Sequence, residues 1–135
     1  MKAVFADTFY WVALTNPADP HNRVVVASAR EIAQTTIITT DAVLTEFLTF
    51  FAENTHCRKR AAQTVQALLD APDVKIVPES RATFLAGFEL YRTRPDKGYS
   101  MTDCISMQTM RREGLTDVLT NDRHFEQEGF KALFR

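Results

Sequence analysis

The amino-acid sequence predicts an α/β protein, a three-layer α/β/α sandwich built on a mainly parallel sheet of four to five strands. Short apolar runs rich in strand-forming residues alternate along the chain with longer segments whose apolar residues recur at helical spacing. This alternation is typical of parallel strands that helices cover on both faces. The 135 residues, of which 45% are hydrophobic, suffice for one domain, so we expect residues 1–135 to form a single unit.

The first third of the chain predicts two strands separated by two helices. The strands are expected at residues 2–6 and 35–39, and the helices at residues 7–15 and about 19–33. Asn16 and Pro17 end the first helix, because proline cannot continue it. Asp19 and Pro20 suit the N-cap and the first turn of the second helix.

The middle of the chain predicts three helices and one strand. The helices are expected at residues 41–54, 58–71 and about 79–92, and the strand at residues 74–78. Asp41 can cap the first of these helices, whose apolar residues follow helical spacing. Pro72 ends the second helix.

The last third begins with a loop and returns to the alternating pattern. The loop is expected at residues 94–99, helices at about 100–114 and 122–129, and strands at 117–120 and 130–134, the last at the sheet edge. Ser100 and Asp103 are spaced like a capping box. Gly114 ends the helix that they begin.

Charge and cysteine content narrow the possible functions. The net charge of −1 gives no overall basic field, so a nucleic-acid partner would need a local patch. Cys57 and Cys104 form no CxxC pair, and we interpret them as free thiols in a reducing compartment. Asp7 interrupts the apolar N-terminal run, and no other run is long enough to span a membrane. We therefore expect a cytoplasmic protein without a membrane partner.

Four acidic residues are placed where a shared site can form. Asp7 and Asp122 each follow a predicted strand, and ligands of parallel sheets gather beyond the carboxyl ends of the strands. Glu46 lies inside an otherwise apolar stretch of helix, which is costly without compensation. Asp103 lies in the first turn of a late helix.

Each acid also has a structural explanation. Asp7 and Asp122 could cap the helices that follow them, and Asp103 could complete the capping box of Ser100. Glu46 could be the polar edge of its helix. The alternative is one cause for all four: clustered carboxylates repel one another, and a divalent cation removes that repulsion. Oxygen ligands suit Mg²⁺ or Mn²⁺, and no zinc-type spacing of Cys and His occurs.

The sequence resembles the PIN domain family, and within it the VapC-type toxin nucleases of bacteria and archaea. The resemblance covers essentially the whole chain and rests on "FADTF", "TEFL", "SMTDCISM" and "VLTNDRHFEQEGF". The acidic residues of the family fall here on Asp7, Glu46, Asp103 and Asp122. One departure is Phe9, where family members often have a small polar residue.

The resemblance implies a metal-dependent endoribonuclease that uses Mg²⁺ or Mn²⁺. Asp7, Asp103 and Asp122 would hold the metal, which lowers the pKa of bound water and steadies the charge on the scissile phosphate. Glu46 would ligate through water or deprotonate the nucleophile. The products would carry a 5′-phosphate and a 3′-hydroxyl. The implied partners are an RNA substrate and a cognate antitoxin protein.

Several other residues are candidates for binding substrate or a protein partner. Thr8, and Thr120 or Asn121, could make the polar contact that Phe9 does not provide. Arg94 and Arg123 could hold RNA phosphates, although solvated charge is the simpler explanation.

The helix that contains "EFLTFF" has more apolar positions than one core face needs. Phe50 or Phe51 could therefore bury in a homodimer or an antitoxin groove, or fill a thick core. His124, two residues after Asp122, could touch substrate, but a structural imidazole beside Phe125 is the simpler expectation.

Three other functions remain open at this point. A haloacid-dehalogenase-type phosphatase also begins with a strand and an Asp, but it needs a second Asp where Phe9 stands. A non-catalytic PIN-like binding module would keep the fold without the chemistry. A stand-alone housekeeping nuclease would act without an antitoxin.

Overall fold

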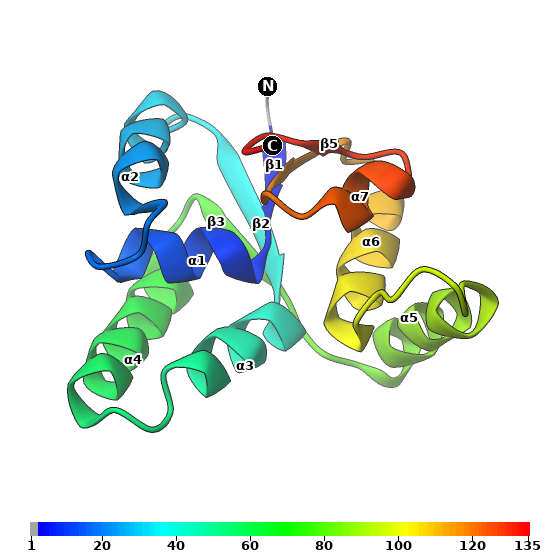
Figure 1. Cartoon of the computed structure of the whole chain (residues 1–135), viewed down its shortest axis with the longest axis horizontal. Helices are drawn as coiled ribbons and strands as arrows, with labels where there is room; N and C mark the ends of the chain where they lie inside the picture. The colour runs from blue at the N-terminus through cyan, green and yellow to red at the C-terminus, as the bar shows by residue number, and fades with distance from the viewer. Residues whose placement is uncertain (1–2) are drawn as a thin grey trace.

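The computed structural model describes residues 3–135, in which five strands form one sheet (Figure 1). The strands are β1 (Ala3–Ala6), β2 (Thr36–Thr40), β3 (Val74–Val77), β4 (Asp117–Leu119) and β5 (Lys131–Ala132). The strand order is β3-β2-β1-β4-β5, and every pairing is parallel. The predicted fold class is confirmed, including the edge strand near the C-terminus. Lys2 of the predicted first strand lies outside the described residues.

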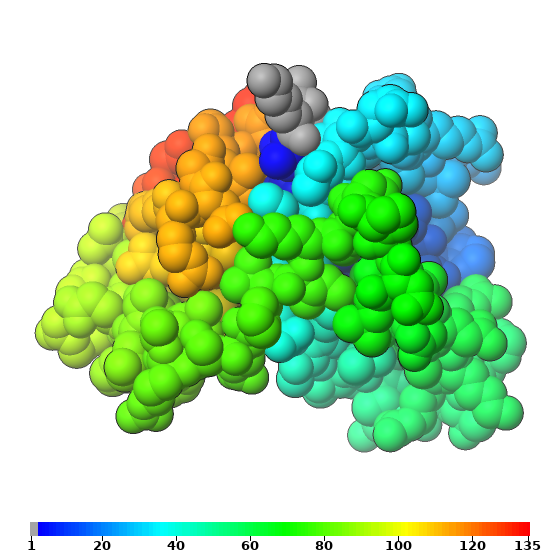
Figure 2. Space-filling model, turned by 180° about the vertical axis from the view of Figure 1, so that it is seen from behind, coloured from blue at the N-terminus to red at the C-terminus, as the bar shows by residue number. Residues whose placement is uncertain are grey.

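The helices cover the two faces of the sheet. They are α1 (Thr8–Thr15), α2 (Asn22–Glu31), α3 (Asp41–Phe50), α4 (Thr55–Asp70), α5 (Arg81–Thr93), α6 (Met101–Glu113) and α7 (Arg123–Gln127). Helices α1 to α4 lie on one side and α5 to α7 on the other (Figure 1). Seen from behind, the earlier and later halves of the chain again occupy opposite sides (Figure 2).

Strands β1 and β4 meet at the point where the strand order reverses. The chain leaves β1 toward one face of the sheet and leaves β4 toward the other. A crevice opens between two such strands at their carboxyl ends, which is the usual ligand position in open parallel sheets. Phe5 pairs with Val118 and Ala6 with Leu119 in this ladder. The residues that follow both strands therefore emerge side by side.

Strand β1, next to this crevice, is buried over its last three residues. Val4, Phe5 and Ala6 have no exposed surface, because β1 is central and helices cover both of its faces. Trp11 is also buried, and its indole N–H donates to Thr39 Oγ1 at 3.3 Å. The start of α1 is thus fixed to a rigid core.

Helix α2 begins later than predicted. It starts at Asn22, because the Asp19 side chain accepts the backbone N–H of His21 at 2.8 Å and closes a turn instead of capping the helix. The predicted N-cap role of Asp19 is therefore wrong.

Helix α3 takes its cap from the residue before Asp41. Thr40 Oγ1 accepts the backbone N–H of Val43 at 3.0 Å, so the predicted N-cap role of Asp41 is also wrong. Asp41 instead accepts the backbone N–H of Glu79 at 2.8 Å. The side chain of Thr40 can reach the same unpaired backbone N–H groups as the side chain of Asp41. The sequence alone does not show which of the two residues caps the helix.

Helix α3 ends at Phe50 and not at residue 54. Asn54 instead accepts the backbone N–H of Cys57 and caps α4, which therefore begins at Thr55, three residues before the predicted start.

Helices α5 and α6 approach each other closely at Gly87. A Cβ atom at this position would lie 2.5 Å from Ile105 Cγ1, so no larger residue fits without movement. This contact holds α6, which carries Asp103, against α5. The predicted capping box of Ser100 and Asp103 is confirmed at the start of α6. Gly114 ends α6 in the left-handed conformation, with φ of 69°.

Two further expectations can be compared with the structure. Within residues 3–135, no helix combines the length and the apolar character that crossing a membrane requires. Cys57 and Cys104 are both free thiols.

Candidate active site

Asp7 occupies the first residue position after β1 but does not cap α1. Its side chain makes no capping hydrogen bond and instead accepts from Thr120 Oγ1 at 2.8 Å. Thr120, which follows β4, is fully buried, and its hydroxyl also accepts the backbone N–H of Asp122 at 3.2 Å. The cap explanation of Asp7 is therefore wrong, and one threonine connects the two strand ends.

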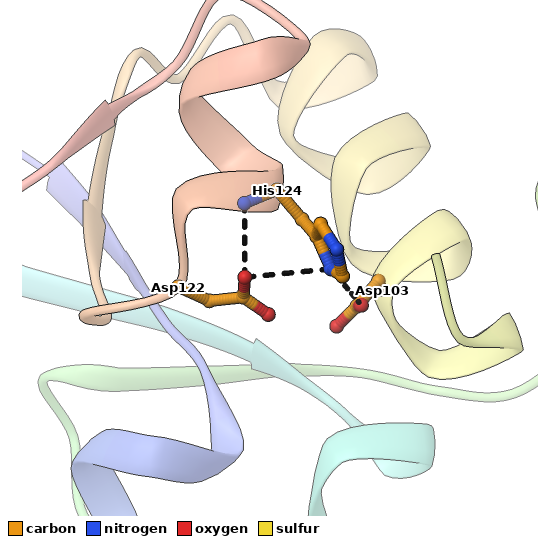
Figure 3. Close-up of side chains that lie close together, drawn as sticks. All are labelled: Asp103, Asp122 and His124. Carbon is orange, nitrogen blue, oxygen red and sulfur yellow. Dashed lines mark hydrogen bonds and ion pairs between the residues drawn. The ribbon is translucent and has the colours of Figure 1, made fainter. Parts of the chain in front are cut away.

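Asp103 and Asp122 act as caps and also lie together. Asp122 accepts the backbone N–H of His124 at 2.9 Å, and Asp103 Oδ2 accepts that of Ser100 at 3.2 Å, so both cap explanations are confirmed. His124 Nδ1 lies 3.4 Å from Asp122 Oδ1 and 3.6 Å from Asp103 Oδ2 (Figure 3). One ligand atom from each of the three residues lies within 4.8 Å of the others. A capping role and a place in the cluster are compatible.

Glu46 joins the cluster from α3. It is half-buried, and its Oε1 accepts from Thr8 Oγ1 at 2.5 Å. The explanation of Glu46 as a solvated helix edge does not account for this contact. Thr8 follows Asp7 directly, so the hydrogen bond ties Glu46 to the end of β1.

The electrostatics of the acids show that they share one environment. Burial and then the charge of Asp103 raise the pKa of Asp7 from 3.8 to about 7, with a smaller contribution from Glu46; the Thr120 hydrogen bond opposes them. Burial, together with the charges of Asp122 and Glu46, raises the pKa of Asp103. All four predicted acids are thus brought together in one electronegative cluster.

The donor atoms of this acidic cluster fit a divalent cation. Within the described chain, the side chains of Glu46, Asp103 and Asp122 each accept hydrogen bonds on one oxygen. The other oxygen of each carboxylate is therefore available: Oε2 of Glu46, Oδ1 of Asp103 and Oδ2 of Asp122. Within residues 3–135, His124 Nδ1 is buried without a hydrogen-bond partner, and it faces two of the acids. A cation would relieve the repulsion that raises the pKa of Asp7.

The predicted polar contacts near Asp7 are only partly in the expected places. Thr8 contacts Glu46. Thr120, rather than Asn121, holds Asp7. Asn121 is half-buried, and its side chain makes no hydrogen bond within residues 3–135. Phe9 packs on aromatic rings, with ring centroids 5.0 Å from His21 and 5.7 Å from Phe134.

The two predicted arginines differ in their surroundings. Arg123 is exposed, and within the described chain no carboxylate lies within 4.0 Å of it. Arg94 is held by Glu128, with Nε 2.9 Å from Oε2. Arg94 therefore lies on a carboxylate outside the four-acid cluster.

His124 contacts the acids in a way that sequence reasoning did not predict. Its ring meets the Tyr99 ring edge-on, with the ring centroids 5.2 Å apart, and its Nδ1 faces Asp103 and Asp122. A usable signal existed, because Asp122 caps the helix and the second residue after a cap lies beside the capping side chain.

Comparison with known proteins gives one family and several relatives. The model of the PIN domain family matches residues 4–131. The 23S rRNA-specific endonuclease VapC20 of Mycobacterium tuberculosis is 25% identical over 130 residues, covering 94% of this chain and 95% of VapC20.

Three solved structures share the fold. The crystal structure of M. tuberculosis VapC20, described as a sarcin-ricin loop cleaving toxin, matches with a TM-score of 0.83 and 24% identity, covering 94% of this chain and 95% of that one. VapBC2 from Rickettsia felis, bound to promoter DNA, matches with a TM-score of 0.71 and 17% identity, covering 96% of each chain. FitAcB from Neisseria gonorrhoeae matches with a TM-score of 0.66 and 19% identity, covering 98% of this chain and 96% of that one.

Proposed function

The chain belongs to the PIN domain family, and from that membership we propose that it is a divalent-metal-dependent endoribonuclease that acts as the toxin of a toxin–antitoxin pair. The observation that carries this proposal is the convergence of Asp7, Glu46, Asp103 and Asp122 in one cluster at the switch point of the sheet. Four acids from distant segments have no common structural purpose there. We propose further that residues 1–135 form a single nuclease domain.

The aspartates would hold the metal. Asp7 is fixed by Thr120, while Asp103 and Asp122 are fixed by backbone N–H groups at helix starts, so each carboxylate is oriented before a cation arrives. Bound there, Mg²⁺ or Mn²⁺ would lower the pKa of a coordinated water and stabilise charge on the scissile phosphate. His124 lies beside two of these aspartates and would orient them or add a nitrogen ligand.

Glu46 is suited to take a proton from the attacking water. Thr8 donates to its Oε1, which leaves Oε2 as the acceptor. Attack on phosphorus breaks the bond to the 3′-oxygen, which leaves as a 3′-hydroxyl once it gains a proton, and the other product keeps a 5′-phosphate. We propose that Thr8 is a positioning residue and that Asn121, Arg94 and Arg123 bind the substrate.

The proposed substrate is structured RNA. The relative VapC20 is a 23S rRNA-specific endonuclease, so ribosomal RNA is the first substrate to test. An RNA substrate of this kind would place the protein in the cytoplasm.

The proposed protein partners are a cognate antitoxin and a second copy of the chain. Phe50 is 63% exposed and lines a groove formed by the end of α3 and the start of α4, and the exposed Leu48 lines a second groove between the same helices, which supports a partner on that surface. Phe51 is buried, so its predicted availability for a partner is wrong. Helix α5 exposes a second apolar surface, made of Phe84, Leu85, Phe88 and Tyr91.

The test is cleavage of total RNA by the purified chain with Mn²⁺. We expect fragments with 5′-phosphates, no cleavage in EDTA, and no cleavage by Asp7→Asn or Asp103→Asn. Asp73→Asn, which changes an exposed acid before β3 at the opposite end of the sheet, is the matched control. Full activity of either cluster variant would remove the catalytic assignment. Mn²⁺ binding without any cleavage would favour a non-catalytic module.

A further inference from the structure

Glu128 is a buried carboxylate that the proposed reaction does not use. It follows α7, and only 5% of its side chain is exposed. Its Oε2 accepts from Arg94 Nε and from the Tyr99 hydroxyl, both at 2.9 Å. Its Oε1 accepts from Arg111 Nη2 at 2.7 Å. Burial alone would raise the pKa of Glu128, but the hydrogen bonds from Arg111, Arg94 and Tyr99 lower it to about 2.

The two arginines around Glu128 carry more charge than it neutralises. Two guanidinium groups against one carboxylate leave a net positive charge. Within residues 3–135, Glu128 is the one carboxylate within 4.0 Å of either guanidinium, and the arginine side chains are 38% and 40% exposed. The exposed acid Asp96 is near Arg94 but pairs with Lys97. Because each guanidinium has five N–H groups, donors remain for an anion after the contacts with Glu128 are made.

Arg94 and Arg111 lie beside the acidic cluster and are connected to it through Glu128 and Tyr99. The Tyr99 hydroxyl binds Glu128, and the Tyr99 ring contacts His124, whose Nδ1 faces Asp103 and Asp122. Tyr99 itself is 5% exposed. In Figure 1, α7 lies beside α6, and the segment that leads into α6 lies on the same side. The acids and the arginines are therefore separated by one buried tyrosine ring.

We propose that Arg94 and Arg111, oriented by Glu128, form a binding site for a backbone phosphate of the RNA substrate next to the scissile one. This proposal rests on the proposed endoribonuclease function and extends it to residues outside the acidic cluster. An RNA strand with one phosphate at the acids presents neighbouring phosphates to this flank, and guanidinium groups match phosphate oxygens in pairs. The arginines also offset the repulsion between the four acids and the RNA backbone. Glu128 acts as a positioning residue, because it touches the arginines and not the RNA.

The test measures RNA binding without cleavage, in the Asp7→Asn background and with a fluorescein-labelled RNA hairpin. Arg94→Gln and Arg111→Gln should each weaken binding roughly three- to tenfold and reduce the slope of log K against log salt by about 0.7. Arg92→Gln is the matched control, because Arg92 pairs with Glu89 on the exposed face of α5. It should change neither quantity.

Glu128→Gln should weaken RNA binding only while both arginines are present. In the Arg94→Gln/Arg111→Gln double variant the same change should have no further effect, which a general loss of folding would not produce. The affinity for Mn²⁺, measured by calorimetry with Asp7 restored, should stay unchanged in the arginine variants.

The possible failures are distinguishable. Unchanged hairpin affinity and salt slope in both arginine variants would overturn the phosphate site, even if the wild-type chain cleaves RNA. Arginine-dependent binding by a chain that never cleaves RNA would keep the site and overturn the nuclease function. Hairpin binding that is absent altogether would overturn both. Arginine-dependent binding of polyglutamate but not of RNA would indicate an acidic protein partner and overturn the RNA assignment.

Discussion

Replacing Asp7 with Asn should stabilise the metal-free protein. The pKa of Asp7 is about 7 in the folded chain, against 3.8 as the ordinary value. Because the folded value is the higher one, folding favours the protonated form of Asp7. The contribution of Asp7 to the stability of the metal-free protein is therefore greatest below pH 3.8 and falls as pH rises from about 4 to 7. Above pH 7 the ionised carboxylate costs the fold about 4 kcal/mol. Asp7→Asn removes this charge, and its amide oxygen can still accept from Thr120 Oγ1.

The assay is urea denaturation in EDTA at several pH values. At pH 8 the variant should be more stable than the wild-type chain by about 2 to 4 kcal/mol, and the difference should shrink toward zero near pH 4. Asp96→Asn, with a side chain 75% exposed, serves as the control and should stay within about 0.5 kcal/mol of wild type throughout. Saturating Mn²⁺ should stabilise the wild-type chain and narrow the gap, because the cation binds the folded form.

Equal or lower stability of Asp7→Asn at pH 8 would refute this reasoning. Such a result would mean that the carboxylate contributes more by its contacts than it costs by burial and repulsion. A constant gain across the whole pH range would also contradict it, since that gain would not come from ionisation.

Three further predictions concern other parts of the site. Thr8→Val should lower kcat for RNA at least about tenfold without changing Mn²⁺ affinity, because Glu46 loses the hydroxyl that orients it; unchanged kcat would remove the positioning role. Gly87→Ala should destabilise the fold by about 1 to 3 kcal/mol in urea titration, because the new methyl meets Ile105; a gain in stability would show that α5 and α6 can separate. Glu128, whose pKa falls from 4.5 to about 2, should stabilise the fold above pH 4.5 by about 1 to 3 kcal/mol, because its arginine partners are partly screened by solvent. This contribution should disappear as pH falls toward 2, so Glu128→Gln should flatten the acid side of the stability curve; a parallel curve would contradict this.

The sequence predicted the architecture well because local patterns carry it. Alternating apolar runs and amphipathic segments determine a parallel sheet covered by helices, and the acids at the ends of β1 and β4 follow from the same pattern. The sequence could not decide which side chain caps a helix when two candidates are adjacent, as with Thr40 and Asp41. Each choice satisfies the same backbone donors, and tertiary contacts such as that of Asp41 with Glu79 decide between them.

Contacts across the fold were beyond sequence reasoning. The hydrogen bond between Thr120 and Asp7 joins residues 113 positions apart, and it depends on the pairing of β1 with β4. Glu128 is a similar case, because a lone Glu near a helix end gives no sign that two arginines and a tyrosine converge on it. The position of the His124 ring depends on how the Asp122 cap is oriented at the start of α7. The spacing suggests this orientation, but only the folded structure defines it.

The pairing of β1 with β4 also bears on when the acidic cluster can form during synthesis. Thr120, whose hydroxyl holds the carboxylate of Asp7, follows Asp7 by 113 residues in the chain. A nascent chain that lacks β4 therefore has an incomplete cluster, in which the carboxylate of Asp7 is unsupported. The order of synthesis thus delays the complete site until β4 has left the ribosome.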